Sequence, residues 1–329
     1  MTAEPLGLND VTALVTDAIA APSLHNAQPW TFRYLRDIGV LRLYADLERA
    51  LPRTDPEHRG LHIGCGAALL NLRVAAAAAG LAPLVRLLPD PARPDFLAEV
   101  HLCGTGPPDG ALAQLGSAVR RRHSSRLPFR DEAIPAAVRR RLCDAAGAEG
   151  AQLLFPGAWH VQTILDLVRD AEGREAVDPE VRGETAQWTR TEPSAAAAAA
   201  DGIPGEAFGP RQRGASAPVR DFTVGRSMTG RGWAPFEKHP NIALLGTGHD
   251  EPVDWLCAGQ ALERVLLRAT ADGLAASVTS QPLEWPEIRW TARDPFSSMA
   301  HVQMVIRLGY GPEGPASPRR PVADVLDVL

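Results

Sequence analysis

The chain has 329 residues, of which 45% are hydrophobic and 22% charged, with a formal net charge of -5 and a pI near 6.0. This balance gives no general attraction to nucleic acid or to anionic membranes, so neither partner is expected. The segment Met1 to Asn9 has no basic region followed by an apolar one, and no run of 18 apolar residues occurs anywhere. We therefore expect a cytoplasmic protein without a signal peptide or a membrane span.

Apolar periodicity before residue 103 predicts two helices and four strands. The helices are expected over 10–21 and 61–80, and the strands over 30–34, 40–44, 84–88 and 96–102. The helix over 61–80 is rich in small residues and apolar on most faces, which is typical of a helix buried in a core or in a subunit-like interface. The glycines and prolines of 104–110 then predict a linker.

The rest of the chain predicts further elements around one long irregular segment. A helix is expected from about 111 into 120–126, with further helices over 134–146, 158–171 and 253–272 and strands over 152–155, 242–245, 275–279 and 301–308. Between about 183 and 240 the periodicities fade, which indicates a lid, a binding loop or disorder. Trp233, Pro235 and Phe236 favour a lid that packs on another part of the protein.

A polar loop joins the first predicted helix to the first predicted strand. It reads Ala-Pro-Ser-Leu-His-Asn-Ala-Gln-Pro-Trp-Thr-Phe over 21–32, and its hydrogen-bonding side chains are Ser23, His25, Asn26 and Gln28. The pattern P-S-x-x-N-x-Q-P-W-x-F resembles the flavin-binding loop of the nitroreductase superfamily, whose members use FMN and usually form intertwined homodimers. A second serine that many members carry is Leu24 here. The resemblance implies that the four polar side chains of the loop bind FMN.

One stretch of the chain recurs without gaps 193 residues later. Gly66-x-Ala68-Leu69, six residues, and Ala76-x-Ala78-x-Gly80-Leu81-Ala82 match Gly259-x-Ala261-Leu262, six residues, and Ala269-x-Ala271-x-Gly273-Leu274-Ala275. Alanine-rich helices can match by chance, but the shared Gly-Leu-Ala end and the constant offset favour a duplication.

A helix of this kind that ends in Gly-Leu resembles the central helix of the nitroreductase fold. Along nearly its whole length the chain resembles the Acg-like branch of the superfamily. The resemblance implies an α+β, nitroreductase-like fold in which two tandem halves form an intramolecular pseudo-dimer, with the lid inserted in the second half. The halves are expected over 1–110 and 111–329, with the insertion at about 183–240. The protein would then be a pseudo-dimeric monomer or a weak homodimer.

A second motif lies in the second half. Arg122, Ser124 and Arg126 fit R-x-S-x-R, the signature with which the superfamily contacts phosphate and the flavin ring. Guanidinium groups form charge-assisted bonds with such oxygens, and a hydroxyl adds a neutral donor, whereas the alternative for this run is a solvated basic face. The first half has no such motif near its start, and 144–152 has lost the loop pattern of 21–32. We therefore expect one FMN per chain.

Two further contacts follow from the resemblance. The stretch 277–281 lies where the superfamily presents backbone N–H groups to the flavin ring, which adds Thr279, Ser280 and Gln281 to the site. Arg319 and Arg320 lie where C-terminal basic residues reach the phosphate, although a solvated tail is an equal alternative for both.

The expected function is that of an FMN-dependent oxidoreductase that transfers hydride between NAD(P)H, or a small metabolite, and an electron-poor acceptor. The flavin supplies the chemistry, so no catalytic acid or base is assigned, and the scattered histidines and cysteines predict no metal site. The alternative is a protein that sequesters or stores FMN under a closed lid, with Trp188, Trp233, Pro235 and Phe236 over the ring. The substrate and the choice between NADH and NADPH stay open. Nucleic-acid binding through 120–126 is disfavoured, because no aromatic residues interleave with the arginines.

Overall fold

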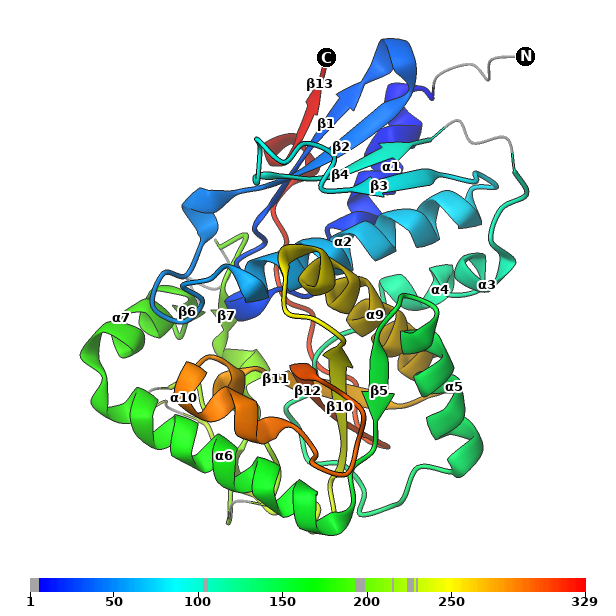
Figure 1. Ribbon diagram of the computed structural model, residues 1–329. Coiled ribbons are helices and arrows are strands. Elements are labelled where there is room, and N and C mark those ends of the chain that lie inside the picture. The colour runs from blue at the N-terminus through cyan, green and yellow to red at the C-terminus, as the bar shows by residue number, and fades with distance from the viewer. Residues whose placement is uncertain (1–5, 103–105, 193–198, 215, 224–227, 229) are drawn as a thin grey trace.

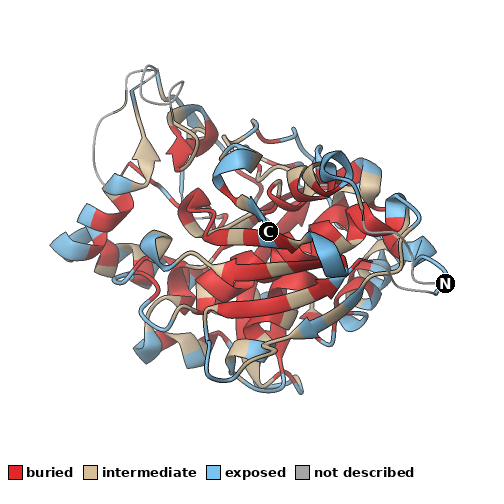
Figure 2. Cartoon of the chain, turned by 90° about the horizontal axis from the view of Figure 1, so that it is seen from above, coloured by how far each residue is buried: buried red, intermediate tan, exposed pale blue. Residues whose placement is uncertain are grey.

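The computed structural model describes residues 6–102, 106–192, 199–214, 216–223, 228 and 230–329. Two α/β halves lie one above the other, and two long helices run between their sheets (Figure 1). Viewed from above, the strands and long helices are mostly buried, whereas exposed residues gather at peripheral loops and helix ends (Figure 2). Within the predicted linker, Gly104 and Thr105 lie outside the described residues.

The first half follows the predicted order of elements. Its helices are α1 (Leu8–Ala18) and α2 (Arg59–Ala78), and its strands are β1 (Trp30–Leu35), β2 (Val40–Ala45), β3 (Leu84–Leu87) and β4 (Phe96–His101). In β1 the side chains of Trp30, Phe32 and Tyr34 alternate with less buried neighbours, so all three aromatic rings pack on the core face of the sheet. The residue at the N-cap of α1 is Gly7, so the helix begins two residues before the predicted start at residue 10.

The second half repeats this order around an insertion. Its helices are α3 (Gly110–Ala113), α4 (Gly116–Val119), α5 (Ala136–Gly147), α6 (Ala158–Val177), α7 (Pro179–Gln187), α9 (Pro252–Ala271) and α10 (Pro286–Arg289). Its main strands are β5 (Gln152–Leu154), β10 (Asn241–Thr247), β11 (Ala275–Thr279) and β12 (His301–Gly309). The insertion between β5 and β10 begins with α6 and α7, earlier than residue 183, and continues through β6 (Thr189–Arg190), β7 (Ile203–Pro204), β8 (Arg211–Gln212) and β9 (Trp233–Ala234).

The two sheets have the same internal strand order. Four strands of the first sheet run β1-β2-β4-β3, and the second sheet runs β5-β10-β12-β11, so each of these four strands has a counterpart in the second sheet. In both halves the long helix follows the second strand, as α2 follows β2 and α9 follows β10. This correspondence supports the duplication that the repeat predicts and gives the chain the form of an intramolecular pseudo-dimer.

The long helices α2 and α9 cross at the equivalent glycines of the repeat. A Cβ atom built on Gly66 would collide with the carbonyl oxygen of Leu256, and one built on Gly259 would collide with the carbonyl oxygen of Ile63. Leu256 is the repeat equivalent of Ile63, at the same offset of 193 residues, so the two collisions are related by the internal symmetry. Absent side chains therefore allow the helix backbones to touch where the two halves meet.

The helix α2 has the length and mean hydropathy of a membrane-spanning segment. Within the best 18-residue window, 83% of it is buried inside the protein, mainly against α9 and the first sheet. Its apolar character is thus accounted for by its place in the core.

The last strand of the chain belongs to the first sheet. Strand β13 (Leu326–Val328) pairs in parallel with β1, so the tail of the second half crosses back to the first half (Figure 1). The sequence predicted only a proline-rich tail here, because a three-residue strand carries no detectable periodicity.

The helix expected from about 111 into 120–126 is wrong beyond Val119. Two short helices, α3 and α4, end there, and Ser124 then forms a parallel β-bridge with Ala276. The extended backbone places Arg122, Ser124 and Arg126, which are two residues apart, on the same face of the chain. In a continuous helix Arg122 and Arg126 would share one face, but Ser124 would lie on the opposite side.

The crossing glycines provide a test of the fold. We expect Gly259→Ala to lower the free energy of unfolding by about 2–3 kcal/mol, because the new methyl group must force α2 and α9 apart. Denaturant unfolding followed by circular dichroism measures the change.

The matched control is Gly173→Ala in the middle of α6, where a Cβ atom would meet nothing within 4 Å. This variant should gain about 0.5–1 kcal/mol from helix propensity. Equal effects of the two substitutions would contradict the close crossing.

Candidate functional site

A cavity of about 540 Å³ lies between the two halves and collects most of the predicted site residues. Nine of the twelve line its wall: Ser23, His25, Asn26, Arg122, Ser124, Arg126, Thr279, Ser280 and Arg319. The other three, Gln28, Gln281 and Arg320, are placed behind the wall, where each bonds to neighbouring protein groups. The wall therefore combines the loop of the first half with the arginine motif and the tail of the second.

The loop over 21–32 adopts a strained backbone. His25, Asn26 and Gln28 have φ values of 50°, 55° and 55°, in the left-handed region that non-glycine residues seldom occupy. Each such residue costs roughly 1–2 kcal/mol, so surrounding contacts must fix the loop.

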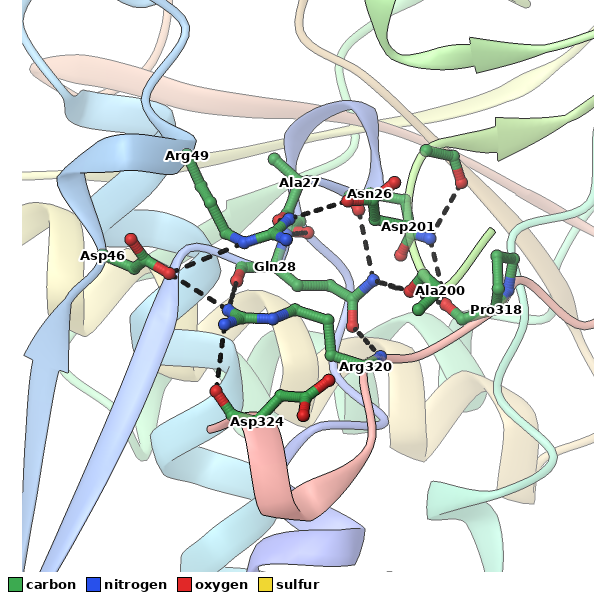
Figure 3. Close-up of polar contacts among 12 residues, drawn as sticks. Asn26, Ala27, Gln28, Asp46, Arg49, Ala200, Asp201, Pro318, Arg320 and Asp324 are labelled. Atoms are coloured by element: carbon green, nitrogen blue, oxygen red, sulfur yellow. Dashed lines mark hydrogen bonds and ion pairs between the residues drawn. The ribbon is translucent and has the colours of Figure 1, made fainter. Parts of the chain in front are cut away.

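Two of the strained residues supply those contacts themselves. The Asn26 amide donates to the carbonyl oxygens of Gly202 at 2.9 Å and Pro318 at 3.0 Å, and its oxygen accepts from Arg319 at 2.9 Å. Gln28 donates to the carbonyl of Ala200 and accepts from the backbone N–H of Arg320, as Figure 3 shows. These bonds tie the loop to the insertion and to the C-terminal tail.

The tail is ordered by its two arginines. Arg320 reaches Asp46 at 3.1 Å and the carbonyl of Asp324, which holds it outside the cavity (Figure 3). Arg319 turns the other way and donates to the carbonyls of Ile19, Ala20 and Ala21 beyond the end of α1. The alternative of a solvated tail is therefore wrong for Arg319, whose half-buried side chain is held by these carbonyl oxygens and by Asn26.

One end of the cavity is strongly cationic. Arg122 forms a buried ion pair with Glu263 at 3.1 Å and donates to the carbonyl of Ala20. Burial and the charge of Arg122 lower the pKa of Arg319 to about 9, and burial and Arg220 lower the pKa of Arg126 to about 10. Even at these values the guanidiniums stay charged at neutral pH, so Arg122 and Arg319 share one buried carboxylate, Glu263, and Arg126 adds a further positive charge to the wall.

The insertion closes the cavity with residues that the sequence did not single out. Ile203, Arg220 and Phe222 line the wall, and the guanidinium of Arg126 lies 4.8 Å from the centre of the Phe222 ring. Thr279, at the end of β11, donates its hydroxyl to the carbonyl of Pro218 and so fastens the same segment to the second sheet.

Arg220 holds this part of the insertion in place. Its guanidinium bonds to Glu175 of α6 at 3.0 Å and to Glu284 at 2.8 Å, and all three side chains are buried. Ser280 adds a hydrogen bond to Glu284, and Gln281 adds one to Glu175. Gln281 and Ser280 thus support the salt bridges that anchor the insertion.

The aromatic residues expected over the ring lie elsewhere. Trp233 is 57% exposed and stacks with Arg211, whereas Phe236 packs in a small cluster with Ala217 and Val219. Trp188 lies near Arg49 on the outside of the loop. The insertion does cover the site, but the aromatic residue that lines the cavity is Phe222. It lies in an irregular segment, so the hydrophobic periodicity of the sequence did not identify it.

The cavity wall also carries the charged residues Arg59, Arg289 and Asp250, and it includes the exposed Trp290. Arg59 at the start of α2 donates to the carbonyl of Gln303, while Arg289 pairs with Asp250 at 2.7 Å. Asp250 also accepts from Gln303 and Trp255, and these hydrogen bonds, followed by Arg289, lower the pKa of Asp250 to about 2 against the opposing effect of burial. Cations and carboxylates are thus paired here, unlike at the Arg122 end.

The repeat identifies the position in the second half that corresponds to the contact of the 21–32 loop with α2. Ser23 packs against Gly64, whose counterpart is Cys257. Burial, Asp254 and Glu149 raise the pKa of Cys257, and Glu149 also forms ion pairs with Arg73 and Arg264. A buried carboxylate therefore occupies the region where a second loop of the 21–32 type would stand.

Comparison with known proteins was made on sequence and on structure. No protein-family model matches the chain. A protein of Mycobacterium tuberculosis H37Rv, "Putative NAD(P)H nitroreductase Rv3131", is 31% identical over 324 residues, which covers 96% of this chain and 91% of the relative. "Putative NAD(P)H nitroreductase acg" of the same strain is 28% identical over 323 residues and covers 97% and 95%.

Among solved structures, the FMN-dependent nitroreductase NfnB from Mycobacterium smegmatis in complex with NADPH is 13% identical to this chain. The match has a TM-score of 0.38 and covers 65% of this chain and 97% of that one.

The acidic cluster around Arg220 predicts a pH dependence of stability. Burial, Asp221 and Glu175 raise the pKa of Glu172 on α6 to about 7 from its ordinary value of 4.5. The unfolded chain then loses this proton at lower pH than the folded one, so the folded state loses stability as the pH rises from about 4.5 to 7. We expect Glu172→Gln to raise the free energy of unfolding at pH 8 by about 1–2 kcal/mol and to give no gain at pH 4.

Denaturant unfolding at the two pH values measures this difference. The control is Asp166→Asn on the same helix, an exposed carboxylate paired with Arg169, which should show no gain between the two pH values. A gain from Glu172→Gln of the same size at pH 4 and pH 8 would contradict the prediction.

Proposed function

Because the chain belongs to the NAD(P)H nitroreductase family, we propose that it is an FMN-dependent oxidoreductase with one FMN in the cavity between its halves. It would transfer hydride from NAD(P)H, or from a small metabolite, to an electron-poor acceptor. The cavity volume of about 540 Å³ lies within the usual range for cofactor sites, roughly 300–1,000 Å³.

The observation that carries this proposal is the charge at the Arg122 end of the cavity. Arg122, Arg126 and Arg319 face it, and Glu263 is the carboxylate behind them. Three positive charges against one negative charge leave an excess of two, which matches a phosphate monoester dianion. Among the described residues Arg126 donates to the carbonyl of Ala207, which leaves most of its five N–H donors for a ligand.

The remaining wall residues suit the rest of FMN. Ser23 and Ser124 bring hydroxyl groups to the wall on opposite sides of the seam between the halves, where they would bind the ribityl hydroxyls. The end of β11, at Thr279 and Ser280, would lie along the ring, with its backbone N–H groups as donors. The bound flavin would supply the hydride chemistry, and the protein would position it and exclude water.

One FMN per chain is part of the proposal. The duplication would have joined 1–110 to 111–329, with two equivalent sites at first. Glu149, paired with Arg73 and Arg264, would now repel a phosphate at the second site. The insertion that covers the retained site also has no counterpart in the described part of the first half, where a short turn joins β1 to β2.

A second function rests on how firmly the insertion is anchored. The buried bonds from Arg220 to Glu175 and Glu284 hold Phe222 on the wall, which would suit a protein that stores FMN. The two functions differ when NADH or NADPH is added to the flavin-loaded protein without oxygen. Rapid loss of the flavin absorbance near 450 nm, roughly where oxidised flavins absorb, supports the oxidoreductase, and a persistent band supports storage.

Flavin binding is tested by removing one charge from the cationic end. We expect Arg126→Gln to weaken FMN binding about 10- to 100-fold, because a charge-assisted contact with the cofactor is lost. Titration of the apoprotein against FMN fluorescence measures the dissociation constant, and wild-type protein should saturate near one flavin per chain.

The control is Arg141→Gln, an exposed arginine of α5 that pairs with Asp272 far from the cavity. It should bind FMN like the wild type. Wild-type saturation near two flavins per chain, or an unchanged affinity in Arg126→Gln, would contradict the proposed site.

A further inference from the structure

His25 is the one polar side chain of the 21–32 loop that reaches the cavity without any protein partner among the described residues. Ser23 accepts a hydrogen bond from the backbone of Gln28, and the amides of Asn26 and Gln28 are fully engaged. His25 is buried, with only 3% of the residue exposed, and neither of its ring nitrogens has a hydrogen-bond partner among the described residues. The other polar side chains of the loop thus bond to the protein and fix the loop, whereas the imidazole of His25 is left facing the cavity.

The surroundings of His25 keep its ring neutral. Burial is the largest effect, and the charges of Arg220 and Arg126 add to it, so the pKa of His25 lies well below its usual value. Arg220 itself is bonded to the carboxylates of Glu175 and Glu284. A neutral imidazole has one N–H donor and one acceptor nitrogen, and both are unused here.

An unpaired imidazole in this position is costly. Leaving a buried polar group without a hydrogen bond costs roughly 1–3 kcal/mol, and the left-handed backbone at residue 25 adds to that cost. Packing alone does not require histidine, because the contact it makes is an edge-to-face approach to Phe222 with the ring centres 5.7 Å apart, which a phenyl ring also satisfies. The two ring nitrogens of His25 are therefore available to bond to a ligand.

We propose that His25 is a catalytic residue whose neutral imidazole N–H donates a hydrogen bond to the oxygen of the electron acceptor on which negative charge develops. The inference rests on the proposed function. With a quinone as acceptor, hydride from the reduced cofactor gives a hydroquinone monoanion, and a proton from water then gives the hydroquinone. A hydrogen bond from His25 to the charged oxygen would lower the barrier to the first step.

The location of His25 favours the acceptor over the cofactor as its partner. Arg122 and Arg319 lie together beside Glu263, whereas His25 lies against Phe222 of the insertion, within reach of the charge of Arg126, at the seam where Asn26 bonds to Gly202. A neutral donor gains strength as charge appears during reduction, while a fixed cation would also hold an anion tightly in the ground state. An uncharged acceptor such as a quinone or a nitroaromatic compound fits this chemistry.

The experiment follows reoxidation of flavin-loaded protein that has been reduced with dithionite, so it does not depend on NAD(P)H. The reduced protein is mixed rapidly with the quinone 2-methyl-1,4-naphthoquinone, and the return of flavin absorbance is recorded between pH 6 and 8. The FMN dissociation constant is measured in parallel for each variant. His25→Phe keeps a ring against Phe222 and removes both hydrogen-bonding atoms.

We expect His25→Phe to slow reoxidation by the quinone about 10- to 100-fold while its FMN affinity stays within about threefold of the wild type. His25→Asn should recover most of the rate, because asparagine tolerates the left-handed backbone and again offers an N–H donor. The control His101→Gln, an exposed histidine on β4, should react like the wild type.

Three results would overturn the inference. An unchanged reoxidation rate in His25→Phe would show that the imidazole does not touch the acceptor. A large loss of FMN affinity with a normal rate in the loaded protein would assign His25 to the cofactor instead. If the rate ratio of wild type to His25→Asn fell about tenfold per pH unit above pH 6.5, the charged ring would be the active form. His123 also lines the cavity, but it is present in both proteins, so its effect on the rate divides out of the ratio of wild type to His25→Asn.

The same measurements separate this inference from the proposed function. Wild-type protein that binds no FMN would overturn both. If the wild type binds FMN and the quinone reoxidises the wild type and His25→Phe at the same rate, the proposed function stands and His25 has no catalytic role.

Discussion

The close crossing of α2 and α9 is the constraint on which the rest of the structure depends. Gly66 and Gly259 let two helix backbones touch, and equivalent carbonyl groups of Ile63 and Leu256 fill the space that a methyl group would need. The cavity lies at the seam that this contact creates, with Ser23 packed on α2 and Arg122 bonded to Glu263 of α9. Any separation of the helices would therefore draw the loop of the first half away from the arginines of the second.

Local patterns in the sequence predicted most of the elements, and the repeat predicted how the halves are related. The errors occur where tertiary contacts decide the backbone. The expected helix through 120–126 gives way to an extended segment because Ser125 bonds to Ala276 and Arg122 bonds to Glu263, neither of which is near in sequence. Strand β13 escaped detection for the same reason, since it exists only as a neighbour of β1.

The site residues show a similar limit. Residue type indicated correctly that the 21–32 loop needs many hydrogen bonds, but it could not tell a bond to a ligand from a bond to the protein itself. Gln28 and Arg320 form their hydrogen bonds behind the wall. The backbone N–H of Arg320 donates to Gln28, and the Arg320 guanidinium donates to Asp46. Conversely, Arg220 and Phe222 lie in an irregular stretch, so no motif marked them, and only the folded chain brings them to the cavity.

The anchoring of the insertion bears on how a substrate could reach the site. Lifting Arg220 away from Glu175 and Glu284 would leave two buried carboxylates unpaired, a change that costs roughly 3–5 kcal/mol, so opening at this point would be rare. The cavity wall also includes Trp290, however, which is 74% exposed and so marks an end of the cavity that opens to the surface. Exchange of small molecules through that end would leave the salt bridges intact. A firmly held insertion is thus compatible with turnover, and storage would require the Trp290 end to be closed as well.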